Sequence, residues 1–249
     1  EKVHSFMQTN SEMEARELFL LCGQKQWRYE RAMSELPKVD LGKIIMRVDY
    51  RPFDVRWTAD NRNILVHRRE RITDHLKFDN IALVFPKNAE SFGGVEMGMF
   101  FVVTRPTDLN MYRRGGAYLL PIYIYPSDTQ DLLHETEADK RPNFSDKFVA
   151  ALKATQGRAI SPEDTLAYLY AVLYTPGYRD RYADFLRRDF PRVPLTSNTR
   201  LFGRLVELGH ELIGLHTLQT VPPRITGYPI AGTGEVVKVR FGIEAGADA

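Results

Sequence analysis

Arginine side chains gather between Tyr50 and Leu76, where they outnumber the carboxylates. A guanidinium donates several hydrogen bonds in a planar fork, which suits phosphate oxygens and guanine edges. The first part of the stretch, YRPFDVRW, combines aromatic residues with arginines, and the second, LVHRRERITDHL, has the basic start of a helix. This combination indicates nucleic acid. The predicted phosphate contacts are Arg51, Arg56, Arg68, Arg69 and Arg71, with Lys87 further along.

A second basic stretch lies between Pro176 and Arg204, where seven arginines stand against three aspartates. The whole chain carries a formal net charge of only +2, so its positive charge is local rather than uniform. Two such stretches favour a polyanionic partner. The alternative is that both are ordinary helix faces whose arginines pair with nearby carboxylates. Similarly, Arg51 and Arg56 either support the phosphate surface or pair internally with Asp54 and Asp60.

The motifs of common DNA-modifying and nucleotide-hydrolysing sites are missing. The chain has neither the Asn/Asp-Pro-Pro-aromatic motif of amino-methyltransferases nor a GxxxxGK[ST] phosphate loop. No set of acidic residues and lysine resembles a metal-dependent nuclease. His210 and Glu211 open a zinc-protease pattern, but Gly214 stands where the second histidine belongs. We therefore predict no catalytic residue, no metal site and no cofactor in this chain.

The composition is that of a chain with a full hydrophobic core. It has 249 residues, of which 43% are hydrophobic, and no apolar run approaches the roughly 18 residues of a membrane span. The sole cysteine, Cys22, follows the apolar run LFLL and is expected to be a small buried side chain. These features predict a cytoplasmic protein without membrane contact.

The pattern of apolar residues predicts an α+β fold. Short β-branched and aromatic runs predict a mixed, sheet-containing lobe at about residues 43–125, which a short helix near residues 68–76 interrupts. A helical lobe follows at about residues 144–218. The predicted units are an N-terminal helical segment at residues 1–37 and one domain at residues 38–249, with strands at 43–126, helices at 144–218 and a C-terminal hairpin at 224–241.

Capping residues mark two of the predicted helix starts. Ser11, with Glu14 three residues later, opens the first of a pair of N-terminal helices, which runs to Gly23. The second helix of the pair stops before Pro37. Ser161 is followed by a proline and an early acidic residue, which is the pattern of a helix N-terminus.

A series of segments carries a family resemblance. These segments are, in order, YRPFDVRW, LVHRRERITDHL, NIALVFP, YLLPIYIYP, DTLAYLYAVLYTPGYRDRYADFLRRDFPRVPL and LFGRLVELGHELIGLH. The series resembles the C-terminal target-recognition, or specificity, region of single-chain restriction-modification enzymes, above all the type ISP enzymes with their adenine-N6 DNA methyltransferase. It departs from the family after RW, where residues 58–60 replace a more aromatic continuation.

The resemblance implies sequence-specific binding of double-stranded DNA without chemistry in this chain. Adenine methylation and cleavage would be performed by other domains of the parent enzyme, with S-adenosylmethionine and magnesium ions as its cofactors. The second partner would be the methyltransferase domain, on which the long helix after FPRVPLTSNTRLF would dock. Two alternatives stay open: a protein-docking module with a basic surface, and an enzyme fragment with unrecognised catalytic residues.

The resemblance also separates packing residues from reading residues. Enzymes of such a family recognise different DNA sequences, so their shared aromatic residues are expected to pack in the core. Loops particular to this chain, at residues 87–99, 104–116 and 127–143, are expected to read the sequence. The middle loop supplies the residue types that contact guanine and adenine edges. The predicted base contacts are Arg105, Asn110, Arg113 and Arg114, and the residues predicted to pack are Tyr50, Pro52, Phe53, Trp57, Tyr168, Tyr170, Tyr174, Tyr178, Tyr182 and Phe185.

Overall fold

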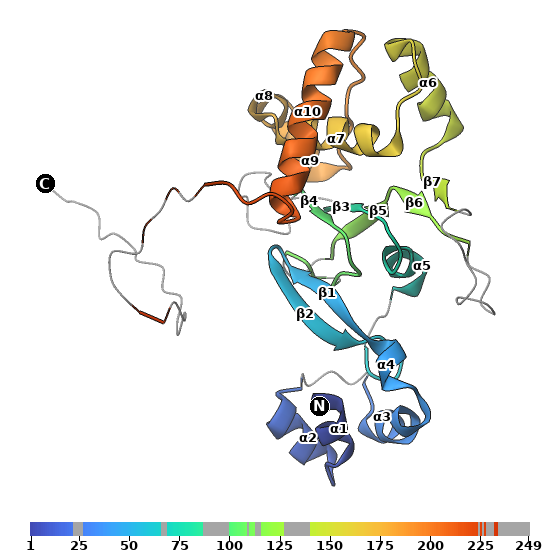
Figure 1. Cartoon of the computed structure of the whole chain (residues 1–249), viewed down its shortest axis with the longest axis vertical. Coiled ribbons are helices and arrows are strands. Elements are labelled where there is room, and N and C mark those ends of the chain that lie inside the picture. Colours follow the sequence, from blue (N-terminus) through green and yellow to red (C-terminus); the bar gives the residue numbers. More distant parts are fainter. Residues whose placement is uncertain are drawn as a thin grey trace, which may run out of the picture.

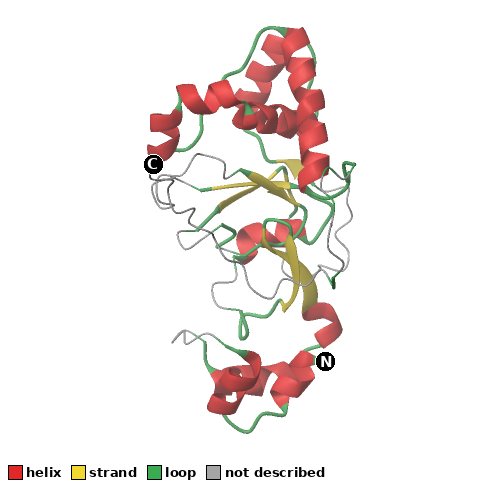
Figure 2. Ribbon diagram, turned by 90° about the vertical axis from the view of Figure 1, so that its left-hand side faces the viewer, coloured by secondary structure: helices red, strands yellow, loops and turns green. Residues whose placement is uncertain are grey.

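The protein is elongated, with helices at both ends and small antiparallel sheets between them (Figures 1 and 2). A computed structural model describes residues 1–21, 27–65, 69–86, 100–108, 110–112, 116–126 and 140–223, together with Ile225, Gly227, Gly232 and Thr233. The α+β class is confirmed. Most of the hairpin predicted at residues 224–241 lies outside the described residues.

The N-terminal helices are α1 (Lys2–Met7), α2 (Glu12–Phe19) and α3 (Tyr29–Glu35), followed by the 3-10 turn η1 (Leu36–Lys38). The predicted cap is confirmed, because the Ser11 side chain accepts a hydrogen bond from the Glu14 backbone N–H at 3.2 Å. Three helices are described where a pair was predicted. The predicted end at Gly23 is also wrong, since Leu20 adopts a left-handed conformation with φ 51° and terminates α2.

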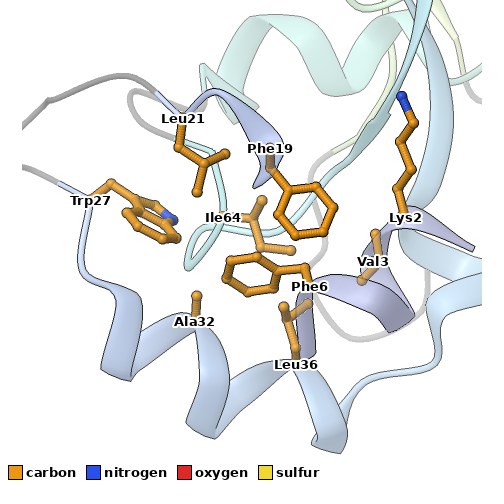
Figure 3. Close-up of a pocket in the computed structure, with 9 residues that line it drawn as sticks. All are labelled: Lys2, Val3, Phe6, Phe19, Leu21, Trp27, Ala32, Leu36 and Ile64. Carbon is orange, nitrogen blue, oxygen red and sulfur yellow. The ribbon is translucent and has the colours of Figure 1, made fainter. Parts of the chain in front are cut away.

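Aromatic packing holds these N-terminal helices together (Figure 3). The Phe6 ring meets the rings of Phe19, Trp27 and Tyr29 edge-on, with centroids about 6 Å apart. An apolar cavity of about 240 Å³ remains beside Phe6. Its lining offers a single charged side chain, so it has little with which to orient a polar ligand. The lining residues are Lys2, Val3, Phe6, Phe19, Leu21, Trp27, Ala32, Leu36 and Ile64.

A two-stranded ribbon connects this end to the middle of the molecule (Figure 1). After the short helix α4 (Leu41–Ile44), strand β1 (Ile45–Arg51) pairs antiparallel with β2 (Asp54–Ala59). Pro52 and Phe53 form the turn. Phe53 has φ 63°, a left-handed conformation that costs a non-glycine residue about 1–2 kcal/mol.

A three-stranded antiparallel sheet forms the centre, in the order β4-β3-β5. Its strands are β3 (Ala82–Phe85), β4 (Phe101–Val103) and β5 (Tyr118–Pro121), and the pair β6 (Tyr123–Ile124) and β7 (Arg141–Pro142) continues beside it. All four residues of β3 are buried, since one face packs on the C-terminal helices and the other on α5 (Glu70–Thr73), η2 (Asp74–Leu76) and the loop after β4. Strands β3, β4, β5 and β6 thus lie within the stretch at residues 43–125 where strands were predicted.

The C-terminal lobe contains α6 (Asp146–Gln156), α7 (Pro162–Tyr174), α8 (Pro176–Arg181), α9 (Ala183–Arg188) and α10 (Thr199–His216). The Ser161 side chain caps α7 by accepting a hydrogen bond from the Asp164 N–H at 3.0 Å. Helix α10 packs along α7 over a core that includes Tyr168, Phe202 and Ile213. Helices α8 and α9 are separate, because the backbone leaves the helical conformation at Tyr182.

Candidate nucleic-acid interface

The predicted base-reading loop lies against the arginine-containing ribbon. Thr107 forms a parallel bridge with Asp49 of β1, on the edge opposite β2. The Asp49 N–H donates to the Pro106 carbonyl at 3.0 Å, and the Thr107 hydroxyl donates to the Asp49 carbonyl at 2.6 Å. Residues 105–108 of the loop therefore extend the ribbon by a short third segment, although more than fifty residues separate the two along the chain.

Two ion pairs reinforce this junction. The Arg51 Nη1 donates to Asp108 Oδ1 at 2.9 Å, and Arg105 Nη1 donates to Asp49 Oδ1 at 3.3 Å. Asp49 is buried, and burial raises the pKa of its carboxyl group despite the opposing effect of Arg105. Each pair joins one predicted DNA-contacting arginine to a carboxylate of the other segment, so both arginines also hold the junction together.

The Tyr50 ring contacts two guanidinium groups. The Cζ atoms of Arg51 and Arg56 are 3.9 and 4.1 Å from its centroid, which is the distance of a cation–π contact. Arg56 also pairs with Asp54, with 2.8 Å between Nη2 and Oδ2, and this hydrogen bond lowers the pKa of the Asp54 carboxyl group. Arg56 is nevertheless exposed to solvent over 57% of its side chain, so it can reach a phosphate.

The structure places the remaining predicted contacts as follows. Arg69 donates to the Ala117 carbonyl at 2.8 Å and so anchors α5 to the start of β5, whereas Arg71 is exposed. Asn110 is half-buried, and its backbone N–H donates to Asp108 Oδ1 at 2.8 Å. Arg68, Lys87, Arg113 and Arg114 lie outside the described residues, as do the loops at residues 87–99 and 127–139.

One group of residues that sequence reasoning placed in the core lies at the surface instead. Trp57 is 70% exposed, Phe53 56% and Tyr182 40%, so the prediction that they pack is wrong, although Phe53 still touches Phe101. Trp57 is exposed because no second layer packs on that face of the two-stranded ribbon. Tyr168, Tyr170 and Tyr178 are buried, as predicted.

Four of the seven arginines in the second basic stretch have hydrogen-bond partners within the described residues. Arg187, Arg192 and Arg204 each reach a carboxylate three residues away, at 3.3, 3.4 and 2.8 Å respectively. Arg179 donates to the Leu173 carbonyl at 2.7 Å and stacks on Tyr174, where it caps the C-terminus of α7. The alternative of a salt-bridged helix face therefore describes part of this stretch, whereas Arg181, Arg188 and Arg200 are exposed. The ribbon with its docked loop is the better candidate interface, because it brings arginines from two distant segments together.

Two properties of the described residues bear on other functions. Among these residues, no group of three or more His, Cys, Asp or Glu side chains could hold a metal ion. Within the same ranges, no helix is long and apolar enough to cross a membrane.

The chain belongs to the type ISP C-terminal specificity domain family, whose model matches residues 1–247. The match confirms the resemblance found in the sequence and extends it over the N-terminal helices. The comparison with curated proteins gave no match.

Three solved structures share the fold. The complex of DrdV with DNA matches with a TM-score of 0.61 and 23% identity, over 89% of this chain and 21% of that one. The ATP-dependent type ISP restriction-modification enzyme LlaBIII, bound to DNA, matches with a TM-score of 0.65 and 19% identity, over 90% of this chain and 14% of that one. A nuclease-deletion mutant of the type ISP restriction-modification enzyme LlaGI, in complex with a DNA substrate mimic, matches with a TM-score of 0.54 and 21% identity, over 84% of this chain and 18% of that one. The chain thus spans about a fifth or less of these enzymes.

Proposed function

We propose that this specificity domain binds double-stranded DNA and directs adenine methylation and cleavage by other domains of a restriction-modification enzyme, in the cytoplasm. The chain itself performs no chemistry in this proposal. The parent enzyme would use S-adenosylmethionine and magnesium ions. All three solved neighbours are DNA complexes of much longer chains, which supports this division of labour.

The docking of residues 104–112 on the ribbon is the observation that carries the proposal. It brings Arg51, Arg56, Arg105 and Asn110 to one region of the molecule. Side chains on neighbouring segments can contact the same duplex: arginines of the ribbon bind phosphates, and loop residues bind base edges. Among the described arginines that were predicted to contact phosphates, Arg56 and Arg71 are the exposed ones, while Arg51 and Arg69, like Arg105 of the loop, also hold parts of the fold in place.

The rest of the parent polypeptide would contact the helical lobe. Helix α10 carries Leu201, Leu205, Leu208, Leu212 and Leu215 at alternating spacings of four and three residues, which form one stripe along the helix. Leu201 and Leu208 are 48% and 41% exposed, although they are large and apolar. Leu205 and Leu212 also pack against the core of the lobe, so we propose that the methyltransferase domain covers the exposed side of this stripe, at Leu201 and Leu208.

The experiment measures duplex binding against salt concentration. The double variant Arg56→Ala/Arg71→Ala is compared with Arg187→Ala/Arg204→Ala, a control that removes the same charge from the self-paired helical lobe. Each lost phosphate contact reduces the slope of log affinity against log salt by about 0.9, so we expect a loss of roughly 1.8 in the first variant, equal for all DNA sequences, and little change in the control.

Two results would contradict the proposal. Equal slopes for wild type and the Arg56/Arg71 variant would place the phosphate contacts elsewhere. Absence of duplex binding even at low salt would instead favour a module that docks only on protein.

A further inference from the structure

Trp57 is exposed in a position where the fold gives it no packing role. Its side chain is 70% exposed, whereas Trp27 packs against Phe6 and Tyr29 in the N-terminal lobe. A tryptophan has the largest apolar side chain, and leaving it in water forfeits about 2–3 kcal/mol of burial. Such an exposed ring is typical of a binding surface.

The residue opposite Trp57 identifies the kind of partner. Register pairing places Arg47 directly across from Trp57, so both side chains project from the same face of the ribbon. Arg47 is exposed, and no ion pair joins it to a carboxylate within the described part of the chain. This face of the ribbon thus presents the aromatic ring of Trp57 beside the exposed guanidinium group of Arg47.

The carboxylates of the ribbon do not oppose this charge. Asp49 is buried and bonded to Arg105, and Asp54 is bonded to Arg56. Within the two strands, Arg47 is therefore the exposed charged residue without an ion pair among the described residues, and it lies beside Trp57. The sugar-phosphate backbone of DNA complements both side chains, while an acidic protein surface would use the charge but not the ring.

We infer that Arg47 and Trp57 form a DNA contact that does not depend on sequence, an inference that rests on the proposed function. Trp57 stacks on a deoxyribose of the backbone, and Arg47 binds the neighbouring phosphate. Every nucleotide carries the same deoxyribose and phosphate, so this contact adds affinity and orients the duplex without selecting a sequence. The docked loop at residues 104–112 lies against the other edge of β1 and is left to read the bases.

Trp57 can report on its own contact. The chain has two tryptophans, so the Trp27→Phe variant leaves Trp57 as the single emitter. We expect titration with a short duplex to quench its emission and to protect it from acrylamide, in step with binding measured by the anisotropy of a labelled duplex. If Trp27→Phe disturbs the N-terminal lobe, the difference between wild type and Trp57→Phe gives the same signal.

Affinity supplies the second readout. Trp57→Ala should weaken binding about 5- to 100-fold on duplexes of different sequence alike, as loss of one buried aromatic contact predicts, and Trp57→Phe should restore most of it. Arg47→Ala should reduce the salt slope by about 0.9.

The failures of the two proposals are distinguishable. Duplex binding without any change in Trp57 emission would overturn the stacking contact and leave the proposed function standing. A loss of affinity in Trp57→Ala for one DNA sequence only would also overturn it. Absence of binding to any duplex would overturn the proposed function, and the contact with it.

Discussion

Gly209 is the point of closest approach between α7 and α10, and an alanine there should severely destabilise the helical lobe. A Cβ atom built on Gly209 would lie 2.0 Å from the carbonyl oxygen of Ala167 and 2.5 Å from its carbonyl carbon. Both are backbone atoms of α7, so no side-chain rotation relieves the overlap, and the helices must separate. Overpacking usually costs about 1–3 kcal/mol, and because backbone stands on both sides we expect about 3 kcal/mol or more.

Gly203 of the same helix provides the matched control. A Cβ atom there meets nothing within 4 Å, so Gly203→Ala should stabilise the lobe by about 0.5–1 kcal/mol through helix propensity alone. The two variants add the same methyl group to the same helix, yet their free energies of unfolding should differ by about 4 kcal/mol. Urea unfolding followed by far-UV circular dichroism measures the difference. Equal stability of the two variants would refute the close helix crossing.

Two further predictions concern Phe53 of the ribbon and His216 of α10, whose rings meet edge-on with centroids 5.9 Å apart. Phe53 holds φ 63°, so Phe53→Gly should be more stable than Phe53→Ala by about 1 kcal/mol in urea unfolding, the reverse of the usual order; a more stable alanine variant would contradict the left-handed turn. The Nδ1 atom of His216 forms a hydrogen bond with the Tyr170 hydroxyl at 2.5 Å, and burial lowers the pKa of His216 in the folded protein. The unfolded chain therefore binds more protons than the folded one, and the free energy of unfolding should fall as the pH drops below about 6.5. His216→Gln should reduce this fall, with His75, whose pKa burial also lowers, accounting for part of the remainder, and identical pH profiles of wild type and variant would refute the assignment.

Local signals in the sequence predicted most of the helices and strands. The caps at Ser11 and Ser161 hold in the structure, because a hydroxyl near the first free N–H groups needs no distant partner. The end of α2 could not be predicted in the same way. Leu20 adopts the left-handed conformation without being glycine or asparagine, and the signal used instead was the nearby Gly23.

The candidate site depends on contacts that sequence patterns do not encode. Nothing local to Asp49 indicates that Pro106 and Thr107 will pair with it. The exposure of Trp57 could not be predicted from its own segment either. An alternating aromatic strand is buried when a large sheet has other layers packed on it, but a ribbon of two strands leaves Trp57 uncovered. The available signal was the register, which sets Trp57 opposite a charged residue rather than an apolar one.

The contact between the ribbon and the loop also limits how residues that contact bases can be identified by mutation. Arg105 compensates the buried carboxylate of Asp49, so its removal would leave a charge in a site where burial already raises the pKa, and the loop would shift whether or not Arg105 touches a base. Asn110 differs, because the bond that fixes its position in the loop is made by its backbone N–H to Asp108, and an alanine keeps that bond. A change of DNA site preference on loss of the Asn110 side chain would therefore report base contact, whereas the same change on loss of Arg105 would report either contact or loop position.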